Sequence, residues 1–373
     1  MEFRDLKAQY LQHKEAIDSA IQNVLLGGHF IGGTPVEERE EKLAAYVGVK
    51  HCITCANGTD ALQLALMTWG IGEGDAVFVP DFTFFSTAEV VPWVGATPVF
   101  VDVYEDTFNM SAESLGEVIQ NVLQEGKLTP KAVIVVDLFG QPADFSAIKK
   151  VTEKYNLLLL EDAAQGFGGK IGEKRACSFG DIATTSFFPA KPLGCYGDGG
   201  AVFTNNDEWA ELIRSYKVHG KGSDKYDNVR IGMNSRLDTV QAAVLIEKLK
   251  IFDEEINRCN EVANAYNQRL KQMIRIPVVL PDVTSTWAQY TVCFESAEQR
   301  LKSVNVFKEK QIPVAIYYKK PLHLQRAFSD NSNKKMNCDT AMRLSDVCLS
   351  LPMHAYMETL DIDIISNVFH EIM

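Results

Sequence analysis

The sequence LLLLEDAAQ occupies residues 157–165 and joins a wholly apolar run to a polar end. Four consecutive leucines are typical of a strand buried on both faces of a parallel sheet. Glu161 and Asp162 follow the leucines, and a carboxylate at the end of a buried strand needs a cationic partner. An alternative role for Asp162 is to cap a following helix. The stretch predicts a parallel sheet whose strand ends carry the functional residues.

Six further apolar runs of strand length flank this one, and helical patterns separate several of them, as at 60–68, 111–123 and 145–155. Apolar strands that alternate with helices predict an α/β fold with a mostly parallel seven-stranded sheet, covered by helices on both faces. The expected strands are residues 51–56, 75–80, 97–103, 131–138, 157–163, 182–187 and 201–204.

The flanking regions predict two N-terminal helices, at 5–26 and 36–47, and a long helix at 237–270. The tail from residue 275 mixes short strands and helices, which is typical of a smaller α+β domain. The expected domains are a large one at residues 1–250, with the helices of 1–48 packed on it, and a small C-terminal one at 251–373.

The composition is that of an ordinary globular protein, with 46% hydrophobic residues and a net charge of -12. An acidic chain without a basic block is a poor candidate for binding nucleic acid. No signal peptide opens the sequence, and no apolar stretch approaches the length that spans a membrane. The sequence therefore predicts a soluble protein with neither nucleic-acid nor membrane partners.

The eight cysteines are scattered, and only Cys52 and Cys55 have metal-site spacing. They lie in a predicted strand, where residues three apart point to opposite faces, so we expect no metal site. Reduced cysteines favour a cytoplasmic location.

Residues 186–200 read SFFPAKPLGCYGDGG and place Lys191 between an aromatic segment and a glycine-rich turn. Burying an unpaired ammonium group is costly, so such a lysine is rarely present for stability. Burial lowers the pKa of the amine, and a deprotonated lysine forms Schiff bases with carbonyl compounds. Lys191 is therefore the candidate catalytic residue, and its chemistry calls for a carbonyl cofactor.

Two other strand ends carry suitable groups. Gly58 and Thr59 follow the first strand and would present N–H groups at a helix N-terminus, where phosphates bind; a plain N-cap is the alternative. Residues 81–87 (DFTFFST) follow the second strand and offer an aromatic cover for a planar ring, although such residues are usually core. The partner of Asp162 could be a protonated pyridine nitrogen.

The order of these motifs along the chain resembles that in the pyridoxal-phosphate sugar aminotransferases of the DegT/DnrJ/EryC1/StrS family. The resemblance extends over essentially the whole chain, and includes residues 3–7, 55–62, 234–238 and 320–325. It implies a homodimer that transfers an amino group, with L-glutamate as the probable donor, to a nucleotide-linked keto-sugar.

The resemblance also implies residue roles. Lys191 would hold pyridoxal phosphate covalently and move the proton, and Asp162 would bind the pyridine nitrogen. The other implied cofactor contacts are Gln165 to the ring hydroxyl, Phe84 on the ring face, Gly58, Thr59 and Ser186 to the phosphate, and Asn234 to the phosphate of the neighbouring subunit.

Three segments, 55–62, 186–201 and 230–243, look most like the branch that aminates C3 of UDP-2-acetamido-2-deoxy-3-oxo-glucuronate for bacterial surface polysaccharide. Arg236 is the candidate for the sugar carboxylate, with a structural ion pair to Asp238 or to another subunit as the alternative. Tyr318 and His323 are further candidates for substrate contact. His323 departs from this branch, so a neutral UDP- or dTDP-linked 3-keto or 4-keto deoxysugar stays open.

Three other functions are less consistent with the residues. Sugar dehydratases on this fold replace the anchoring lysine with histidine, and this chain has Lys191. A regulatory protein would need an added DNA-reading domain, and residues 1–48 lack a basic face. A nicotinamide oxidoreductase would carry a glycine fingerprint after its first strand, which is missing here.

Overall fold

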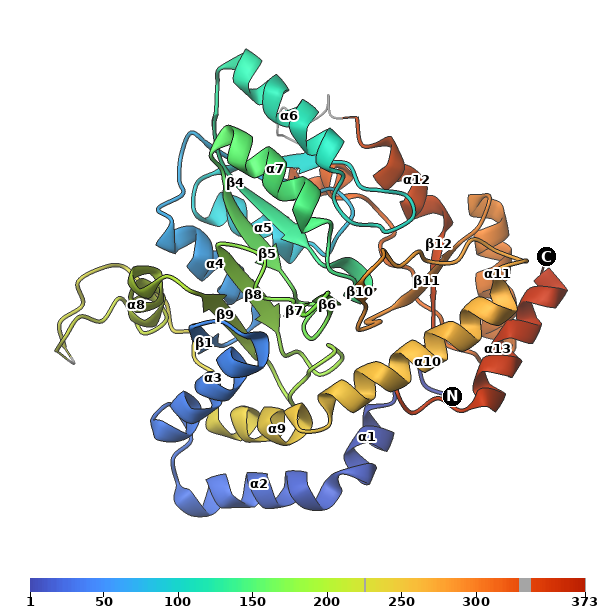
Figure 1. Ribbon diagram of the computed structural model, residues 1–373, viewed down its shortest axis with the longest axis horizontal. Helices are drawn as coiled ribbons and strands as arrows, with labels where there is room; N and C mark the ends of the chain where they lie inside the picture. Colours follow the sequence, from blue (N-terminus) through green and yellow to red (C-terminus); the bar gives the residue numbers. More distant parts are fainter. Residues whose placement is uncertain (225, 329–336, 373) are drawn as a thin grey trace.

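The computed structural model describes residues 1–224, 226–328 and 337–372. A seven-stranded sheet lies at its centre (Figure 1). All its neighbouring strands run parallel, except that the one at Gly200–Thr204 is antiparallel to both neighbours, so the predicted fold class is confirmed. The strand order is β1 (His51–Cys55), β9 (Gly200–Thr204), β8 (Ile182–Ser186), β5 (Leu158–Asp162), β4 (Thr129–Val136), β2 (Asp75–Pro80) and β3 (Thr97–Val101).

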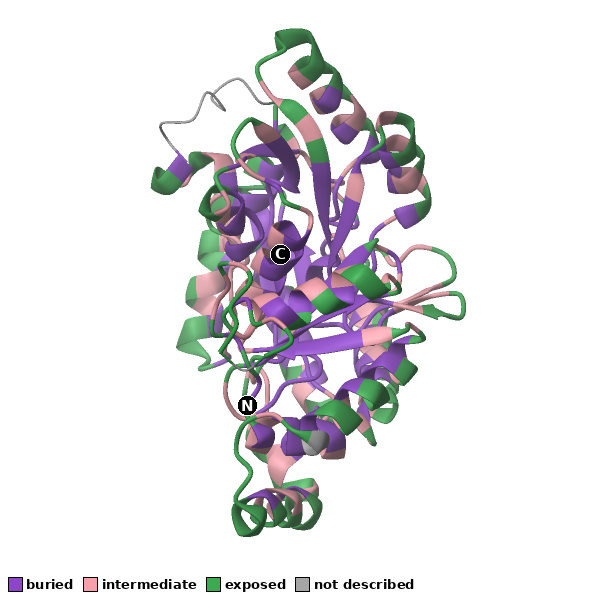
Figure 2. Ribbon diagram, turned by 90° about the vertical axis from the view of Figure 1, so that its left-hand side faces the viewer, coloured by how far each residue is buried: buried purple, intermediate pink, exposed green. Residues whose placement is uncertain are grey.

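Helices cover both faces of the sheet, because each strand sends alternate apolar side chains to the two sides. Figure 2 shows the result: the strands are buried and the outer surfaces of the helices are exposed. One face packs against α4 (Gly58–Thr68), α5 (Ser86–Trp93) and α8 (Asp207–Tyr216). The other packs against α3 (Thr34–Val47), α6 (Ala112–Glu125), α7 (Phe145–Tyr155) and α9 (Thr239–Leu249).

A second hydrophobic core lies in the C-terminal part of the chain. There, helices pack on a two-stranded antiparallel sheet, as expected for an α+β unit. The domain boundary near residue 250 stays a prediction. The elements of this part are α10 (Phe252–Leu270), β10 (Val283–Thr284), β11 (Tyr290–Cys293), α11 (Ala297–Glu309), α12 (Asp339–Val347), β12 (Cys348–Leu351) and α13 (Thr359–Ile372); β10 pairs with the hairpin β6 (Lys170–Ile171) and β7 (Lys174–Arg175).

Two expected helices are each divided in the structure. The prediction of one helix at 5–26 was wrong, because His13 separates α1 (Leu6–Gln12) from α2 (Lys14–Gly27). The expected helix at 237–270 is broken between α9 and α10, where Lys250 and Ile251 make i to i−3 hydrogen bonds. Apolar residues continue at helical spacing across both breaks, so periodicity alone does not reveal them. None of the helices in the described ranges is long and apolar enough to cross a membrane.

Candidate active site

A cavity of about 700 Å³ opens at the carboxyl ends of the central strands. These ends meet at one edge of a parallel sheet, so residues far apart in the sequence converge there. The strand ends contribute Asn57 after β1, Thr83 after β2, Val136 of β4, Asp162 of β5 and Ser186 of β8. The predicted residues Gly58, Thr59, Phe84, Gln165, Lys191 and Tyr318 line the same cavity.

Asp162 presents a buried carboxylate to this cavity, and its residue is only 4% exposed. Its Oδ2 accepts a hydrogen bond of 3.0 Å from the Thr87 hydroxyl, and its Oδ1 accepts one of 3.2 Å from the Ala164 N–H. Burial raises the pKa of Asp162, while the Ala164 N–H and the charge of Lys191 oppose that rise. Such a carboxylate is stabilised by a cation that enters the cavity.

Lys191 lies on the loop that follows β8 and lines the cavity together with Asp162. Burial lowers the pKa of the Lys191 amine, and the negative charge of Asp162 opposes this effect. A lowered pKa increases the fraction of neutral amine, which is the form that attacks a carbonyl group.

Gln165 and Tyr318 form one hydrogen-bonded unit in the cavity wall. The Gln165 Nε2 donates to the Tyr318 hydroxyl at 3.0 Å, and its Oε1 accepts from the Phe139 N–H at 2.7 Å. These bonds fix the orientation of the Gln165 amide. The sequence predicted that Tyr318 contacts the substrate. In the structure, Tyr318 lines the cavity and is the hydrogen-bond partner of Gln165, a predicted cofactor residue.

The turn into α4 has the geometry of an anion site. Asn57 is its N-cap, and the Asn57 side chain accepts from the Asp60 N–H at 2.8 Å. A Cβ atom on Gly58 would lie 2.7 Å from the Cβ of Ser186, so a side chain there would collide with the end of β8. Glycine thus brings the helix N-terminus, Thr59 and Ser186 together, as phosphate binding requires.

Phe84 lies at the mouth of the cavity and is 54% exposed, so it is not part of the hydrophobic core. Thr87, three residues later, was not predicted as a site residue. The motif DFTFFST contains this hydroxyl, but its contact with Asp162 joins residues 75 apart and depends on the tertiary fold.

Asn234 and Arg236 lie outside this cavity, on the exposed segment between α8 and α9. The alternative ion pair between Arg236 and Asp238 is not found among the ion pairs of the described residues. Within one subunit, the structure therefore does not bring Asn234 or Arg236 into the cavity that Lys191 lines.

His323 is also outside the cavity lining. Its side chain binds Asp81, the residue that follows β2. Its Nδ1 lies 2.5 Å from the Asp81 Oδ2, and its main-chain N–H donates to the Oδ1 at 2.7 Å. Asp81 raises the pKa of His323. Cys338 completes a cluster of three possible metal ligands. The direct His–Asp hydrogen bond leaves no room for an ion between them, so we interpret the cluster as a structural link.

Pyridoxal phosphate fits these residues by its chemistry. The buried carboxylate of Asp162 matches a protonated pyridine nitrogen, and the amine of Lys191 matches an aldehyde. The space that Gly58 leaves open beside Ser186 matches a phosphate group. The ring nitrogen, the aldehyde and the phosphate of the cofactor thus each have a complementary feature in the cavity.

The comparisons with known proteins agree with this chemistry. Residues 11–370 match the profile of the DegT/DnrJ/EryC1/StrS aminotransferase family. UDP-2-acetamido-2-deoxy-3-oxo-D-glucuronate aminotransferase from Pseudomonas aeruginosa is 46% identical over 98% of both chains. UDP-N-acetyl-3-dehydro-alpha-D-glucosamine 3-aminotransferase from Acidithiobacillus ferrooxidans is 36% identical over 94% of this chain and 91% of its own. A DegT DnrJ EryC1 StrS aminotransferase from Brucella abortus has a similar structure, with a TM-score of 0.97, 48% identity, and coverage of 100% of this chain and 99% of its own.

The match extends over nearly all of the chain, so the resemblance carried by the sequence motifs is confirmed. The predicted enzyme class and cofactor are confirmed with it, because aminotransferases of this family use pyridoxal phosphate. The chain belongs to the DegT/DnrJ/EryC1/StrS aminotransferase family and is a pyridoxal-phosphate-dependent sugar aminotransferase.

Proposed function

We propose that this enzyme transfers an amino group from L-glutamate to C3 of UDP-2-acetamido-2-deoxy-3-oxo-glucuronate. The observation that carries the proposal is the 46% identity, over 98% of both chains, with an enzyme named for that substrate. The amino sugar would serve the synthesis of a bacterial surface polysaccharide, such as the O-antigen of lipopolysaccharide. The eight free, buried cysteines support a cytoplasmic location.

We assign the following roles to the residues of the cavity. Pyridoxal phosphate, when bound, supplies an electron sink for the charge left by removal of the α-proton of the donor. Lys191 anchors the cofactor, and its Nζ takes that proton as a general base and returns it as a general acid. Asp162 stabilises positive charge at the ring nitrogen. Gln165, Phe84, Gly58, Thr59 and Ser186 orient the ring and the phosphate.

The charges of the cavity support a homodimer with shared active sites. Among the described residues that line it, Lys191 is the only cation, whereas Asp60, Glu89, Asp162 and Asp198 are acidic. A nucleotide sugar brings a diphosphate, and a uronate adds a carboxylate, so further cations are needed. We infer that Arg236 and Asn234 supply polar contacts to the cavity of a second subunit.

The surface around Arg236 is suited to such a contact. The loop that follows α8 projects from the body of the molecule (Figure 1). On this loop, Val229 is 53% exposed and Ile231 is 90% exposed. Phe30 and Ile31, whose main chain pairs with that of Thr239 and Asp238, are also exposed. Exposed apolar side chains of this size are typical of protein interfaces.

A panel of keto-sugars tests the substrate. The pyridoxamine form of the enzyme should return to the aldehyde form fastest with the UDP-linked 3-oxo-glucuronate, as followed by visible absorption. The Arg236→Met variant should lower kcat/KM for this sugar by about 10- to 100-fold, the loss expected for a charge-assisted hydrogen bond, and leave neutral sugars within about twofold. Fastest turnover of a neutral sugar would contradict the uronate assignment.

A mixed dimer tests whether the site is shared. Lys191→Ala and Arg236→Met subunits carry different tags, are co-expressed, and the hetero-assembly is purified. If Arg236 acts across the interface, one of the two sites combines both defects and the other is intact, so about half of wild-type kcat is expected, with KM as in wild type. If Arg236 acts in its own subunit, neither site of the hetero-assembly is intact. No activity with the wild-type KM should then be recovered, and this result would exclude the shared site.

A neutral sugar is the second candidate substrate. Among the described lining residues no arginine faces the cavity, and His323, which departs from the uronate branch, is engaged with Asp81. The 36% identical relative from Acidithiobacillus ferrooxidans is named for a UDP-linked sugar without a uronate group. The panel of keto-sugars distinguishes the two candidates directly.

A further inference from the structure

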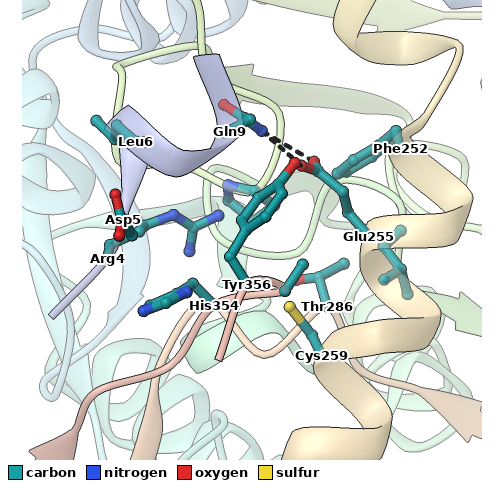
Figure 3. Close-up of a pocket in the computed structure, with 13 residues that line it drawn as sticks. Arg4, Asp5, Leu6, Gln9, Phe252, Glu255, Cys259, Thr286, His354 and Tyr356 are labelled. Atoms are coloured by element: carbon teal, nitrogen blue, oxygen red, sulfur yellow. Dashed lines mark hydrogen bonds between the residues drawn. The ribbon is translucent and has the colours of Figure 1, made fainter. Parts of the chain in front are cut away.

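The N-terminal segment brings a cation to the loop of the predicted catalytic lysine. The Arg4 Nη2 donates a hydrogen bond of 3.1 Å to the main-chain oxygen of Lys191, across 187 residues of sequence. The Arg4 side chain enters a small pocket that is lined by α1, α10 and Pro192 (Figure 3). Arg4 thus contacts the main chain of the residue whose amine lines the cavity.

The positive charge of Arg4 is not matched by an ion pair within the described residues. Glu255 is in the same pocket, but its carboxylate accepts from the Gln9 amide at 2.8 and 3.0 Å and from the Tyr356 hydroxyl at 2.5 Å (Figure 3). Asp5 caps α1 by accepting from the Ala8 N–H. Burial lowers the pKa of Arg4.

The segment that carries Arg4 is held by the C-terminal part of the chain. The carbonyl of Phe3 accepts a hydrogen bond of 3.1 Å from the Met353 N–H. The Phe3 ring meets the ring of Tyr317, which lines the cavity, with 6.3 Å between centroids. These contacts fix the position from which the Arg4 side chain extends.

A second buried cation holds the same loop. Lys248 of α9 is 2% exposed, and its Nζ donates to the main-chain oxygen of Gly194 at 2.5 Å. The Nζ also lies over the Tyr196 ring, 5.0 Å from its centroid. The loop after β8 is therefore held at Lys191 by Arg4 of the N-terminal segment and at Gly194 by Lys248 of α9.

We propose that Arg4 is a positioning residue for Lys191, because its hydrogen bond fixes the main chain from which the amine extends. The positive charge of Arg4 also lowers the pKa of the Lys191 amine. Asp162 faces Lys191 with the opposite charge. The titratable groups that face Arg4 itself are Asp5, Lys191, Lys248, Glu255, Cys259, Tyr317 and His354. The proposal rests on the proposed role of Lys191 as the cofactor anchor.

The rate at which cofactor-free protein captures pyridoxal phosphate tests the proposal, because only the neutral amine reacts. This rate is followed by absorption across a pH series. Removing the charge in Arg4→Met should raise the pKa of Lys191, so the pH midpoint of capture should rise, and capture below that midpoint should be slower than in wild type. Arg4→Lys keeps the charge and should keep the wild-type midpoint.

Arg300→Met is the matched control, because the Arg300 Nη1 also donates to a main-chain oxygen, that of Ser345, at 2.9 Å in the C-terminal part. Its capture profile should equal that of wild type. A wild-type midpoint in Arg4→Met would overturn the proposal, and Arg4→Gln provides the same measurement if Arg4→Met does not fold. Failure of the wild-type protein to capture the cofactor at Lys191 would instead overturn the proposed role of Lys191.

Discussion

The Lys191→Ala variant is expected to lose at least about 10³-fold in kcat and to keep the fold of the wild-type protein. The amine has two assigned tasks, anchoring the cofactor and moving a proton, and alanine performs neither. The fold should survive because burial disfavours the charged amine, so its removal relieves a cost. Steady-state transamination measures the loss, and thermal unfolding monitors the fold.

Lys154→Ala is a suitable control for this variant. Lys154 is an exposed lysine in the last turn of α7 and is not among the residues that line the cavity. Its replacement should leave kcat and thermal unfolding close to those of wild type. Steady-state turnover by Lys191→Ala at a rate within about tenfold of wild type would remove Lys191 from the mechanism.

The central sheet could be predicted because its signal is local. Most strands carry an apolar run, as in the four leucines before Glu161, and the residues that follow a parallel strand lie at the carboxyl edge of the sheet. The antiparallel β9 ends at the opposite edge. This reasoning places Gly58 and Asp162 near one another, and the family resemblance adds Ser186. The cavity contains all three.

The contacts that tune the site could not be predicted in this way. Thr87 binds Asp162 across 75 residues, and Arg4 binds the main chain of Lys191 across 187 residues. His323 and Asp81 are 242 residues apart. Hydrophobic periodicity reports which face of an element is buried, but it does not report which polar groups meet across elements.

Asp162 and Glu161 show how neighbouring carboxylates differ. Successive residues of β5 point to opposite faces, so only Asp162 reaches the cavity. Glu161 accepts hydrogen bonds from the N–H groups of Cys177, Phe179 and Gly180 on the other side. Burial raises the pKa of Glu161 to about 7, and these three donors oppose that rise. Its hydrogen bonds are structural, whereas the carboxylate of Asp162 is available to a ligand.

Asp162→Asn should therefore separate activity from stability. The amide oxygen can still accept from Thr87, but the negative charge that stabilises a protonated ring nitrogen is removed, so kcat should fall by about 10³-fold or more. Because burial raises the pKa of Asp162, its ionised form costs stability above the pKa of the unfolded chain. An amide NH₂ that faces the Ala164 N–H offsets this gain, so the free energy of unfolding of the cofactor-free variant at pH 7 should stay within about 1 kcal/mol of wild type.

Glu161→Gln is the matched control and should behave in the opposite way. An amide NH₂ would face N–H donors that now bind a carboxylate, so the free energy of unfolding should fall by about 1–3 kcal/mol. Cofactor affinity should change little, because this side chain is not part of the cavity lining. Denaturant unfolding of both variants measures the change in the free energy of unfolding, and cofactor titration measures the change in cofactor affinity. Turnover in Asp162→Asn close to that of wild type would show that the charge at this strand end is not required for transamination.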